Sequence, residues 1–412
     1  MQRRVVVTGM GVVSPVGNSV KEFWEGLLAG RNNVDYITHF DASEYSTRFA
    51  AEVRNFSPEG ILDRRDIRRM DLYTQYAMVA THEAIEDSGL DLEKIDLNRA
   101  GVVIGSGIGG ILSFELEHEK FLKNGPRRIS PYFVPQMISD IAAGQVSIRY
   151  GFKGPNYSTV SACATANHAI GDAVRMIKYG DAEVIIAGGS EAAITPMGVG
   201  GFCAMKALST RNDDPKRASR PFDKERDGFV IGEGAGIVVL EELEHARRRG
   251  ATIYAEIRGI GFTADAYHVT APAPGGEGAV RAMRRCIEDG QLNPEEIDYI
   301  NAHGTSTPYN DKTETEAIKT LFGDHAYRLN ISSTKSMTGH LLGAAGGVEL
   351  IATVLAVKHG VIPPTINYEY PDPECDLNYT PNQPQERPVR AAISNAFGFG
   401  GHNACIAVAR FE

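Results

Sequence analysis

Cysteine is scarce in this sequence, and its spacing excludes two kinds of small scaffold. The 412 residues contain five cysteines, with no C-x-x-C pair and no spacing typical of a zinc finger. A disulfide framework requires paired cysteines in an oxidising compartment. We therefore expect reduced thiols in a cytoplasmic protein. The cysteines stand at positions 163, 203, 286, 375 and 405.

An excess of positive charge is also lacking. There are 42 Lys and Arg against 52 Asp and Glu, a net charge of −10, which argues against nonspecific nucleic-acid binding and requires a local basic patch for any anionic partner. No apolar run is expected to span a membrane. Residues 1–4 lead into an apolar strand without a signal-peptide core. The sequence thus predicts no nucleic-acid and no membrane partner.

The sequence has no low-complexity linker, although its length favours two or three domains. Short apolar strands alternate with helices, which predicts an α/β fold whose sheet is covered by helices. The pattern restarts near residue 254 and indicates two topologically similar halves, 1–250 and 251–412. The expected strands are 4–8, 101–105, 184–188, 236–240, 255–261, 299–301, 330–333, 391–394 and 405–409, and the expected helices include 74–88, 277–289 and 344–359.

The segment 160–168 carries the first chemical signal. A β-branched run at 157–161 precedes small residues around Cys163, and apolar residues then recur at helical spacing until Gly180. This pattern predicts a strand, a sharp turn and a buried helix with Cys163 in its first turn. A helix N-terminus favours a thiolate, so Cys163 is a candidate nucleophile. A small buried core cysteine is the alternative that this segment leaves open.

Two downstream loops rich in Gly, Ser and Thr each hold a histidine. His303 follows an apolar strand, and His340 closes the segment 333–340 before a helix. Because packing asks for little at such positions, two histidines there favour function over a structural role. Lys335 lies in an otherwise uncharged stretch, which indicates a buried or site-facing lysine. The other nine histidines, including His39, His245 and His359, are interpreted as structural and surface-like.

Two glycine-rich loops follow strands and carry weaker signals. Residues 105–110 resemble a dinucleotide loop, but no later strand brings a carboxylate to the required place. Nucleotide binding is therefore disfavoured. Residues 397–401, taken alone, read as turn glycines.

Together, four motifs resemble those of the β-ketoacyl-acyl-carrier-protein synthases. They are 160–167, the run His303-Gly304-Thr305-Ser306-Thr307-Pro308, the segment 335–340 and the loop 397–401. Segments 362–368 and 371–377 are most similar to the type II synthases of bacterial fatty-acid elongation. The resemblance extends from residue 4 to residue 409. It departs from the family at position 402, where histidine stands in place of threonine, and this puts nothing catalytic in doubt.

This resemblance implies a thiolase-like five-layer α-β-α-β-α fold in a homodimer. It also implies a decarboxylative Claisen condensation, in which malonyl-acyl-carrier protein and an acyl-enzyme thioester give 3-oxoacyl-acyl-carrier protein. Cys163 would attack the incoming acyl thioester. His303 and His340 would donate hydrogen bonds to the malonyl thioester oxygen as carbon dioxide leaves.

Further roles at the reaction centre are implied in the same way. Lys335 would order the site electrostatically, through Glu349. The backbone N–H groups of Cys163 and Phe399 would form the oxyanion hole, and Ile108 and Phe399 would line the acyl pocket. The resemblance implies no redox or metal cofactor, and it leaves a structural monovalent cation possible.

The implied partner is an acidic acyl carrier protein. Thr305 and Thr307 resemble the hydroxyls that bind its pantetheine arm. The carrier itself requires a basic entrance, although for each single cation ordinary surface charge is the simpler interpretation. The candidates are Arg64, Arg65, Arg68, Arg69, Arg127, Arg128 and Lys206.

Three alternatives share the implied fold. A thiolase needs a second catalytic cysteine, and a type III synthase pairs its cysteine with His and Asn, so the two His loops argue against both. A noncatalytic chain-length or scaffold subunit would lack the nucleophile, and Cys163 argues against it. The sequence leaves open the preferred acyl chain length and unsaturation.

Overall fold

A ten-stranded mixed sheet runs through the molecule, and its two halves repeat one strand pattern. The computed structural model describes residues 3–412, so Met1 and Gln2, where the predicted N-terminal segment begins, lie outside the described residues. The strand order is β10-β9-β13-β14-β8-β1-β7-β6-β4-β5. From the central β8–β1 pair outward, each half has two antiparallel pairings followed by two parallel ones. This confirms the predicted duplication of topology, while the boundary at residue 250 stays a prediction.

The strands of the first half are β1 (Val5–Val13), β4 (Ala100–Gly105), β5 (Asn156–Tyr157), β6 (Val184–Glu191) and β7 (Gly234–Glu242). Those of the second half are β8 (Ala255–Ala264), β9 (Ile297–Asn301), β10 (Asn330–Ser332), β13 (Ala391–Gly398) and β14 (His402–Ala409). Two small antiparallel two-stranded sheets pair β2 (Asp35–Tyr36) with β3 (Phe49–Ala50), and β11 (Val361–Ile362) with β12 (Gln385–Glu386).

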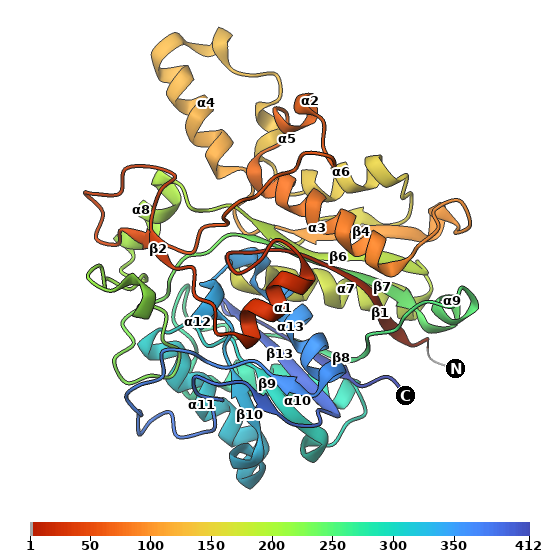
Figure 1. Cartoon of the computed structure of the whole chain (residues 1–412), viewed down its shortest axis with the longest axis vertical. Helices are drawn as coiled ribbons and strands as arrows, with labels where there is room; N and C mark the ends of the chain where they lie inside the picture. The colour runs from red at the N-terminus through yellow and green to blue at the C-terminus, as the bar shows by residue number, and fades with distance from the viewer. Residues whose placement is uncertain (1–2) are drawn as a thin grey trace.

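Helices form three layers around these strands (Figure 1). The outer layers are α3 (Leu72–Ser88) with α6 (Ile141–Tyr150), and α10 (Glu277–Asp289) with α11 (Pro308–Phe322). Between the two halves lie α7 (Thr165–Tyr179) and α13 (Ala345–His359), which pack against each other and against strands of both halves. The five-layer α-β-α-β-α arrangement is thereby confirmed. The other helices are α1 (Val20–Leu28), α2 (Arg64–Ile67), α4 (Ile111–Asn124), α5 (Phe133–Met137), α8 (Pro196–Ala204), α9 (Leu243–Arg248) and α12 (Lys335–Thr338).

β4 ends at Gly105 as predicted, but the glycine after residue 8 does not end β1. β1 continues past residue 8 to Val13, through Gly9 and Gly11. A Cβ at Gly11 would lie 1.8 Å from the carbonyl oxygen of Ala80 in α3. These glycines therefore permit close packing of a helix on the strand.

The segment around Cys163 is less regular than predicted. Only Asn156 and Tyr157 pair in the sheet, and residues 158–161 have no strand partner. The N–H of Ser161 donates instead to Thr165 Oγ1, at 2.9 Å. Cys163 lies in a 3₁₀ turn, Ala162–Ala164, directly before α7, rather than in the first turn of the helix. Gly180 ends α7 in the left-handed conformation, as predicted.

One apolar stretch is long enough to span a membrane, although none of that length was expected from the sequence. Leu342–His359 spans 18 residues with a mean hydropathy of 1.3, which is long and apolar enough to cross a membrane. In the fold, 89% of this stretch is buried inside the protein. A helix that is apolar all round fits the middle layer, because α13 packs against strands of both halves.

Candidate active site

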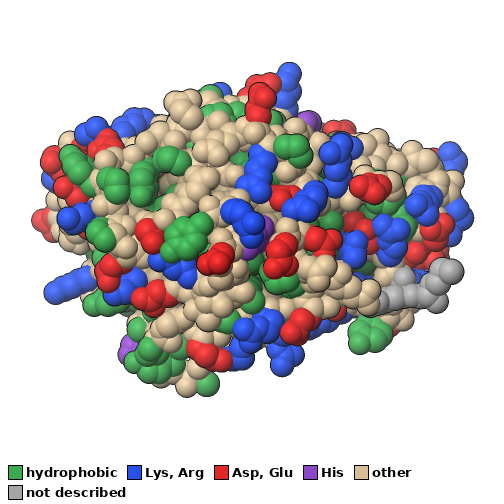
Figure 2. All heavy atoms as spheres, turned by 90° about the horizontal axis from the view of Figure 1, so that it is seen from below, with side chains coloured by type: hydrophobic (Ala, Val, Ile, Leu, Met, Phe, Trp, Pro, Cys, Tyr) green, Lys and Arg blue, Asp and Glu red, His purple; other side chains and the backbone are tan. Residues whose placement is uncertain are grey.

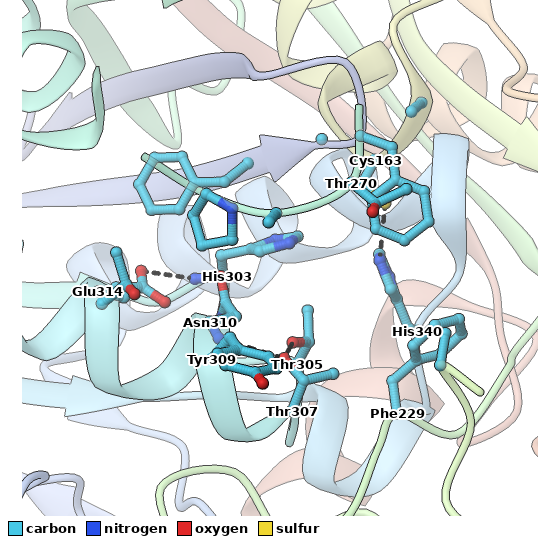
Figure 3. Close-up of a pocket in the computed structure, with 18 of the residues that line it drawn as sticks. Cys163, Phe229, Thr270, His303, Thr305, Thr307, Tyr309, Asn310, Glu314 and His340 are labelled. Carbon is cyan, nitrogen blue, oxygen red and sulfur yellow. Dashed lines mark hydrogen bonds between the residues drawn. The ribbon is translucent and has the colours of Figure 1, made fainter. Parts of the chain in front are cut away.

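A cavity of about 490 Å³ opens onto Cys163 and is lined by residues of both halves. The turn before α7 contributes Cys163, and loops after β9 and around α12 contribute His303 and His340. The three side chains converge, although they are separated by up to 177 positions in the sequence (Figure 3). The predicted catalytic residues thus meet in one place.

The thiol of Cys163 lies beside the ring of His340. The distance from Cys163 Sγ to His340 Nε2 is 3.0 Å. Burial raises the pKa of Cys163 to about 12, although the positive charge of Lys335 acts in the opposite direction. This direction opposes the expectation that the helix N-terminus favours a thiolate, because a buried thiolate loses its hydration.

His340 is held in one tautomer by the backbone. The N–H of Leu342 donates to His340 Nδ1 at 3.3 Å, which leaves the ring proton on Nε2, the atom that faces the sulfur. Burial, and then the charge of Lys335, lower the pKa values of His303 and His340 well below the usual value. Both rings are therefore neutral at pH 7 and can act as hydrogen-bond donors.

Lys335 and Glu349 form the buried ion pair that the resemblance implied. Both side chains are almost fully inaccessible, and Lys335 Nζ donates to Glu349 Oε1. Burial raises the pKa of Glu349 to about 7, although Lys335 opposes that rise. Cys163, His303 and His340 also present three donor atoms within 4.8 Å of one another, which would suit a transition metal. The ammonium of Lys335 disfavours a cation there, just as it disfavours protonation of the histidines.

The loop between β13 and β14 approaches the nucleophile through its backbone. The backbone N–H of Phe399 acts on the thiol of Cys163 in the direction that lowers its pKa. A Cβ at Gly398 would lie 3.1 Å from the backbone nitrogen of Cys163, so the approach requires glycine. Ile108 and Phe399 both line the cavity. The turn glycines of 397–401 thus serve the site.

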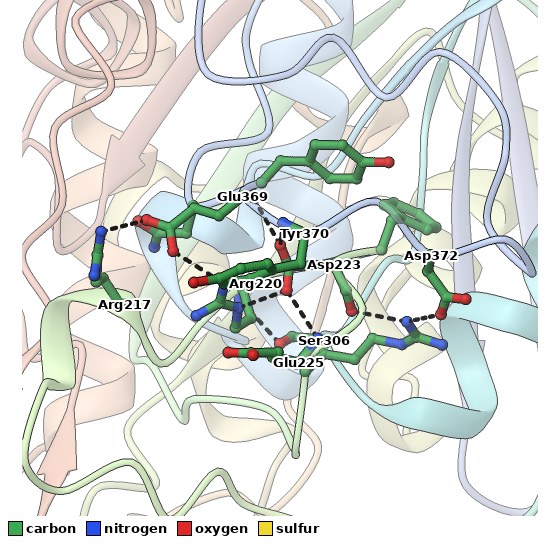
Figure 4. Close-up of polar contacts among 12 residues, drawn as sticks. Arg217, Arg220, Asp223, Glu225, Ser306, Glu369, Tyr370 and Asp372 are labelled. Atoms are coloured by element: carbon green, nitrogen blue, oxygen red, sulfur yellow. Dashed lines mark hydrogen bonds and ion pairs between the residues drawn. The ribbon is translucent and has the colours of Figure 1, made fainter.

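Thr305 and Thr307 lie on the cavity wall with their hydroxyls joined, Oγ1 to Oγ1 at 2.9 Å (Figure 3). Behind them lies a buried polar network that the sequence reading missed (Figure 4). Arg226 donates to the carbonyls of Thr307, at 3.2 Å, and of Pro308, at 3.1 Å, and to the Asp372 carboxylate at 2.6 Å. The network holds the loop in place from behind.

Buried carboxylates support the site in ways the sequence did not reveal. Glu314 in α11 accepts hydrogen bonds from the N–H groups of His303, at 2.9 Å, and Gly304, at 2.8 Å. Glu191 is the last residue of β6 and has small, uncharged neighbours along the chain. The same signal had pointed to Lys335 and could have pointed to Glu191. Two of the histidines interpreted as surface-like are not so: His325 Nε2 lies 2.9 Å from the carbonyl oxygen of Ile297, and His168 Nδ1 lies 2.7 Å from Ser161 Oγ.

Three buried oxygen atoms around Glu349 lack a hydrogen-bond partner among residues 3–412. They are Asn301 Oδ1, Glu349 Oε2 and Ser394 Oγ. Asn301 pairs with Ser394 across β9 and β13, and its amide donates to the carbonyl of Glu349 at 3.3 Å. A set of oxygen donors is what a hard cation prefers, so these residues fit a structural monovalent cation.

The predicted carrier-binding cations are exposed but dispersed. Arg64 and Arg65 lie in α2, Arg68 and Arg69 follow it, and Arg69 stacks over Tyr132. The pair Arg127 and Arg128 lies beyond the end of α4, and Lys206 lines the rim of the cavity. No partner chain tests this patch, so it stays a prediction.

Residues 2–246 match the N-terminal domain of the beta-ketoacyl synthases, and residues 254–369 match their C-terminal domain. The chain belongs to the beta-ketoacyl synthase family. It is 55% identical to a 3-oxoacyl-[acyl-carrier-protein] synthase 2 of Coxiella burnetii over 99% of each chain. It is 52% identical to the protein of that name from Synechocystis, over 100% of this chain and 99% of the relative.

Solved structures agree with this assignment. A beta-ketoacyl synthase of Burkholderia phymatum superposes with a TM-score of 0.93 at 37% identity over the whole of both chains. A type II PKS ketosynthase, solved in complex with its acyl-carrier protein, superposes with the same TM-score at 36% identity over the whole of both chains. The thiolase-like fold of the family is therefore the fold of this chain.

Proposed function

We propose that this protein is a 3-oxoacyl-acyl-carrier-protein synthase II, which carries out the chain-elongating condensation of fatty-acid synthesis. The observation that carries the proposal is the meeting of Cys163 Sγ with His340 Nε2 at 3.0 Å, beside His303 and the N–H of Phe399. A noncatalytic subunit would not need a nucleophile held beside two histidines.

In the first half-reaction, the sulfur of Cys163 attacks the carbonyl carbon of an acyl-carrier thioester. The tetrahedral oxyanion is stabilised by the N–H groups of Cys163 and Phe399. Its collapse breaks the bond to the carrier sulfur, which leaves as a thiol with the proton of Cys163. The acyl group stays on the enzyme as a thioester.

In the second half-reaction, malonyl carrier loses carbon dioxide, and the electron pair of the broken C–C bond forms an enolate. His340 Nε2–H and the neutral ring of His303 stabilise the developing charge on the thioester oxygen. The enolate carbon then attacks the acyl thioester on Cys163. The bond to sulfur breaks, Cys163 leaves as a thiolate and takes up one proton from solvent to become a thiol again, and 3-oxoacyl carrier leaves.

The cavity supports a pantetheine arm beside Thr305 and Thr307 and an acyl chain beside Ile108 and Phe399. For the carrier we propose the basic residues Arg65, Arg68, Arg69, Arg127, Arg128 and Lys206, with Lys206 at the rim of the cavity. A homodimer is supported by α4, which projects from the body of the molecule (Figure 1) and exposes Phe114, Leu116, Phe121 and Leu122. Apolar patches of this kind are typical of an interface.

Mass spectrometry of the protein incubated with acyl carrier tests the proposal, because one acyl adduct is expected, on Cys163. Cys163→Ser should abolish condensation and leave the fold intact, because a hydroxyl is far less acidic and less nucleophilic than a thiol in the same setting. Cys163→Gln should retain malonyl decarboxylation, which depends on the histidines. Condensation by the serine variant at the wild-type rate would contradict the assignment of the nucleophile.

A further inference from the structure

Glu191 is a fully buried carboxylate that the two half-reactions do not use directly. Each of its oxygens accepts two hydrogen bonds: Oε1 from Ser106 Oγ at 2.9 Å and Ile108 N at 3.2 Å, and Oε2 from Gly107 N at 2.8 Å and Gly343 N at 2.9 Å. Because all four partners are donors, the geometry is that of an ionised carboxylate.

We propose that Glu191 is a positioning residue that ties the His340 loop to the Ile108 loop, and so couples the decarboxylating histidine to the wall of the acyl pocket. The proposal rests on the function given above, since it assigns both loops a part in the condensation.

Internal symmetry explains why an anion fits at this point. Gly343 is the middle residue of a 3₁₀ turn, Leu342–Ala344, before the 15-residue helix α13, as Cys163 is in Ala162–Ala164 before the 15-residue helix α7. The first residue of each turn has a positive φ, 50° at Ala162 and 49° at Leu342. The N–H of Gly343 is thus the counterpart of the N–H of Cys163. The Cys163 group would donate to the oxyanion of the substrate, whereas the Gly343 group donates to the carboxylate of Glu191.

On one side, Glu191 acts on His340 through two consecutive backbone groups. It holds the N–H of Gly343, and the preceding N–H, that of Leu342, donates to His340 Nδ1 at 3.3 Å. Leu342 is in the left-handed region, which is unfavourable for a residue with a branched side chain. The bond to Glu191 offsets that cost and keeps the donor aimed at His340.

On the other side, Glu191 fixes the start of the loop after β4. The N–H groups of Gly107 and Ile108 both point at it, and Ile108 lines the cavity. A Cβ at Gly107 or at Gly343 would lie 2.7 Å from Glu191 Oε2, so both loops need glycine to reach the carboxylate. A displacement of Ile108 by a long acyl chain is therefore transmitted to the turn that orients His340.

The test is Glu191→Gln, assayed separately in the two half-reactions. The amide turns its NH₂ toward two donors in either orientation, so one of the two loops is released. We expect malonyl decarboxylation to fall about tenfold, because a mispositioned proton donor loses part of a 10²–10⁴-fold contribution. Transfer of a short acyl chain to Cys163 should stay within about threefold, because its oxyanion donors are untouched.

Glu241→Gln is the matched control, since Glu241 is equally buried but pairs with Arg249 away from the cavity. It should lower both half-reactions equally or not at all. If Glu191→Gln does not fold, Ser106→Ala, which removes one donor, should show the same split to a smaller degree. An equal change in the two half-reactions, or none, in the folded variant overturns the coupling. A wild-type protein without either half-reaction would instead overturn the proposed function.

Discussion

At the scale of single residues, burial sets the protonation of the reaction centre. Cys163, His303 and His340 are all uncharged at rest because charged forms lose their hydration inside the protein. Lys335 places a positive charge beside these three residues and is paired with the carboxylate of Glu349. The charge that the site stabilises therefore arises only during the reaction.

The pH profile should report this arrangement. Protonation removes a histidine from its role as a neutral donor, and both pKa values lie well below 6.5, so the acid limb of decarboxylation should lie below pH 6.5. Lys335→Met removes one cause of the lowered values, and the limb should move toward higher pH. Burial raises the pKa of Glu349 to about 7 even beside Lys335, so without the lysine this carboxyl takes up a proton more readily.

The measurement is the rate of malonyl decarboxylation between acid and neutral pH. Lys178→Met is a suitable control, because Lys178 pairs with Asp289 outside the cavity. An unchanged acid limb in Lys335→Met would contradict the part assigned to the lysine.

At the scale of loops and helices, carboxylates and guanidinium groups hold irregular backbone in place. The loop 303–307 has no strand to fix it, yet the N–H groups of His303 and Gly304 donate to Glu314 and the carbonyl of Thr307 accepts from Arg226. Ser306 has a φ of 70°, and its hydroxyl accepts the N–H of Arg220 at 2.9 Å. Such a network gives a loop the precision of a regular element.

Arg226→Lys should loosen this loop without unfolding the protein. An ammonium cannot span two carbonyls and a carboxylate as the planar guanidinium does. We expect the KM for carrier-bound substrates to rise about tenfold, the equivalent of one charge-assisted hydrogen bond, with a smaller change in kcat. Steady-state kinetics measure this against Arg249→Lys, which alters an ion pair with Glu241. A fall in kcat at constant KM would place Arg226 in another role.

At the scale of the whole molecule, charge is mixed rather than segregated. The face seen from below carries Lys and Arg interspersed with Asp and Glu, with apolar side chains scattered between them (Figure 2). With a net charge of −10, an acidic carrier is repelled at long range and needs a local attraction.

Reversal of Arg65, Arg68, Arg69, Arg127, Arg128 and Lys206 to Glu, singly and in groups, should therefore raise the KM for acyl carrier and flatten its dependence on salt. Surface charges act mainly on encounter and orientation. Acyl groups on free pantetheine, which do not need the patch, should react almost as before. An equal loss with both substrate forms would mean that these residues support folding instead.

The sequence by itself determined the alternation of strands and helices and the repeat of topology, and it singled out the three side chains that the structure brings together. These are local or periodic properties: strand runs, helical spacing, and reactive residues placed where packing requires little. The resemblance of whole motifs also implied the Lys335–Glu349 pair, which the structure contains.

Only the tertiary structure decided which groups are charged and which backbone groups face them. Burial raises the pKa of Cys163, and the sequence could not show this because the desolvation of a thiolate depends on everything packed around it. The glycines of β1 were strand interior rather than strand ends, because α3 approaches them from 70 residues away. Glu191 joins segments centred on residues 107 and 343, and no pattern along the chain reveals that contact, because a hydrogen bond depends on proximity in space.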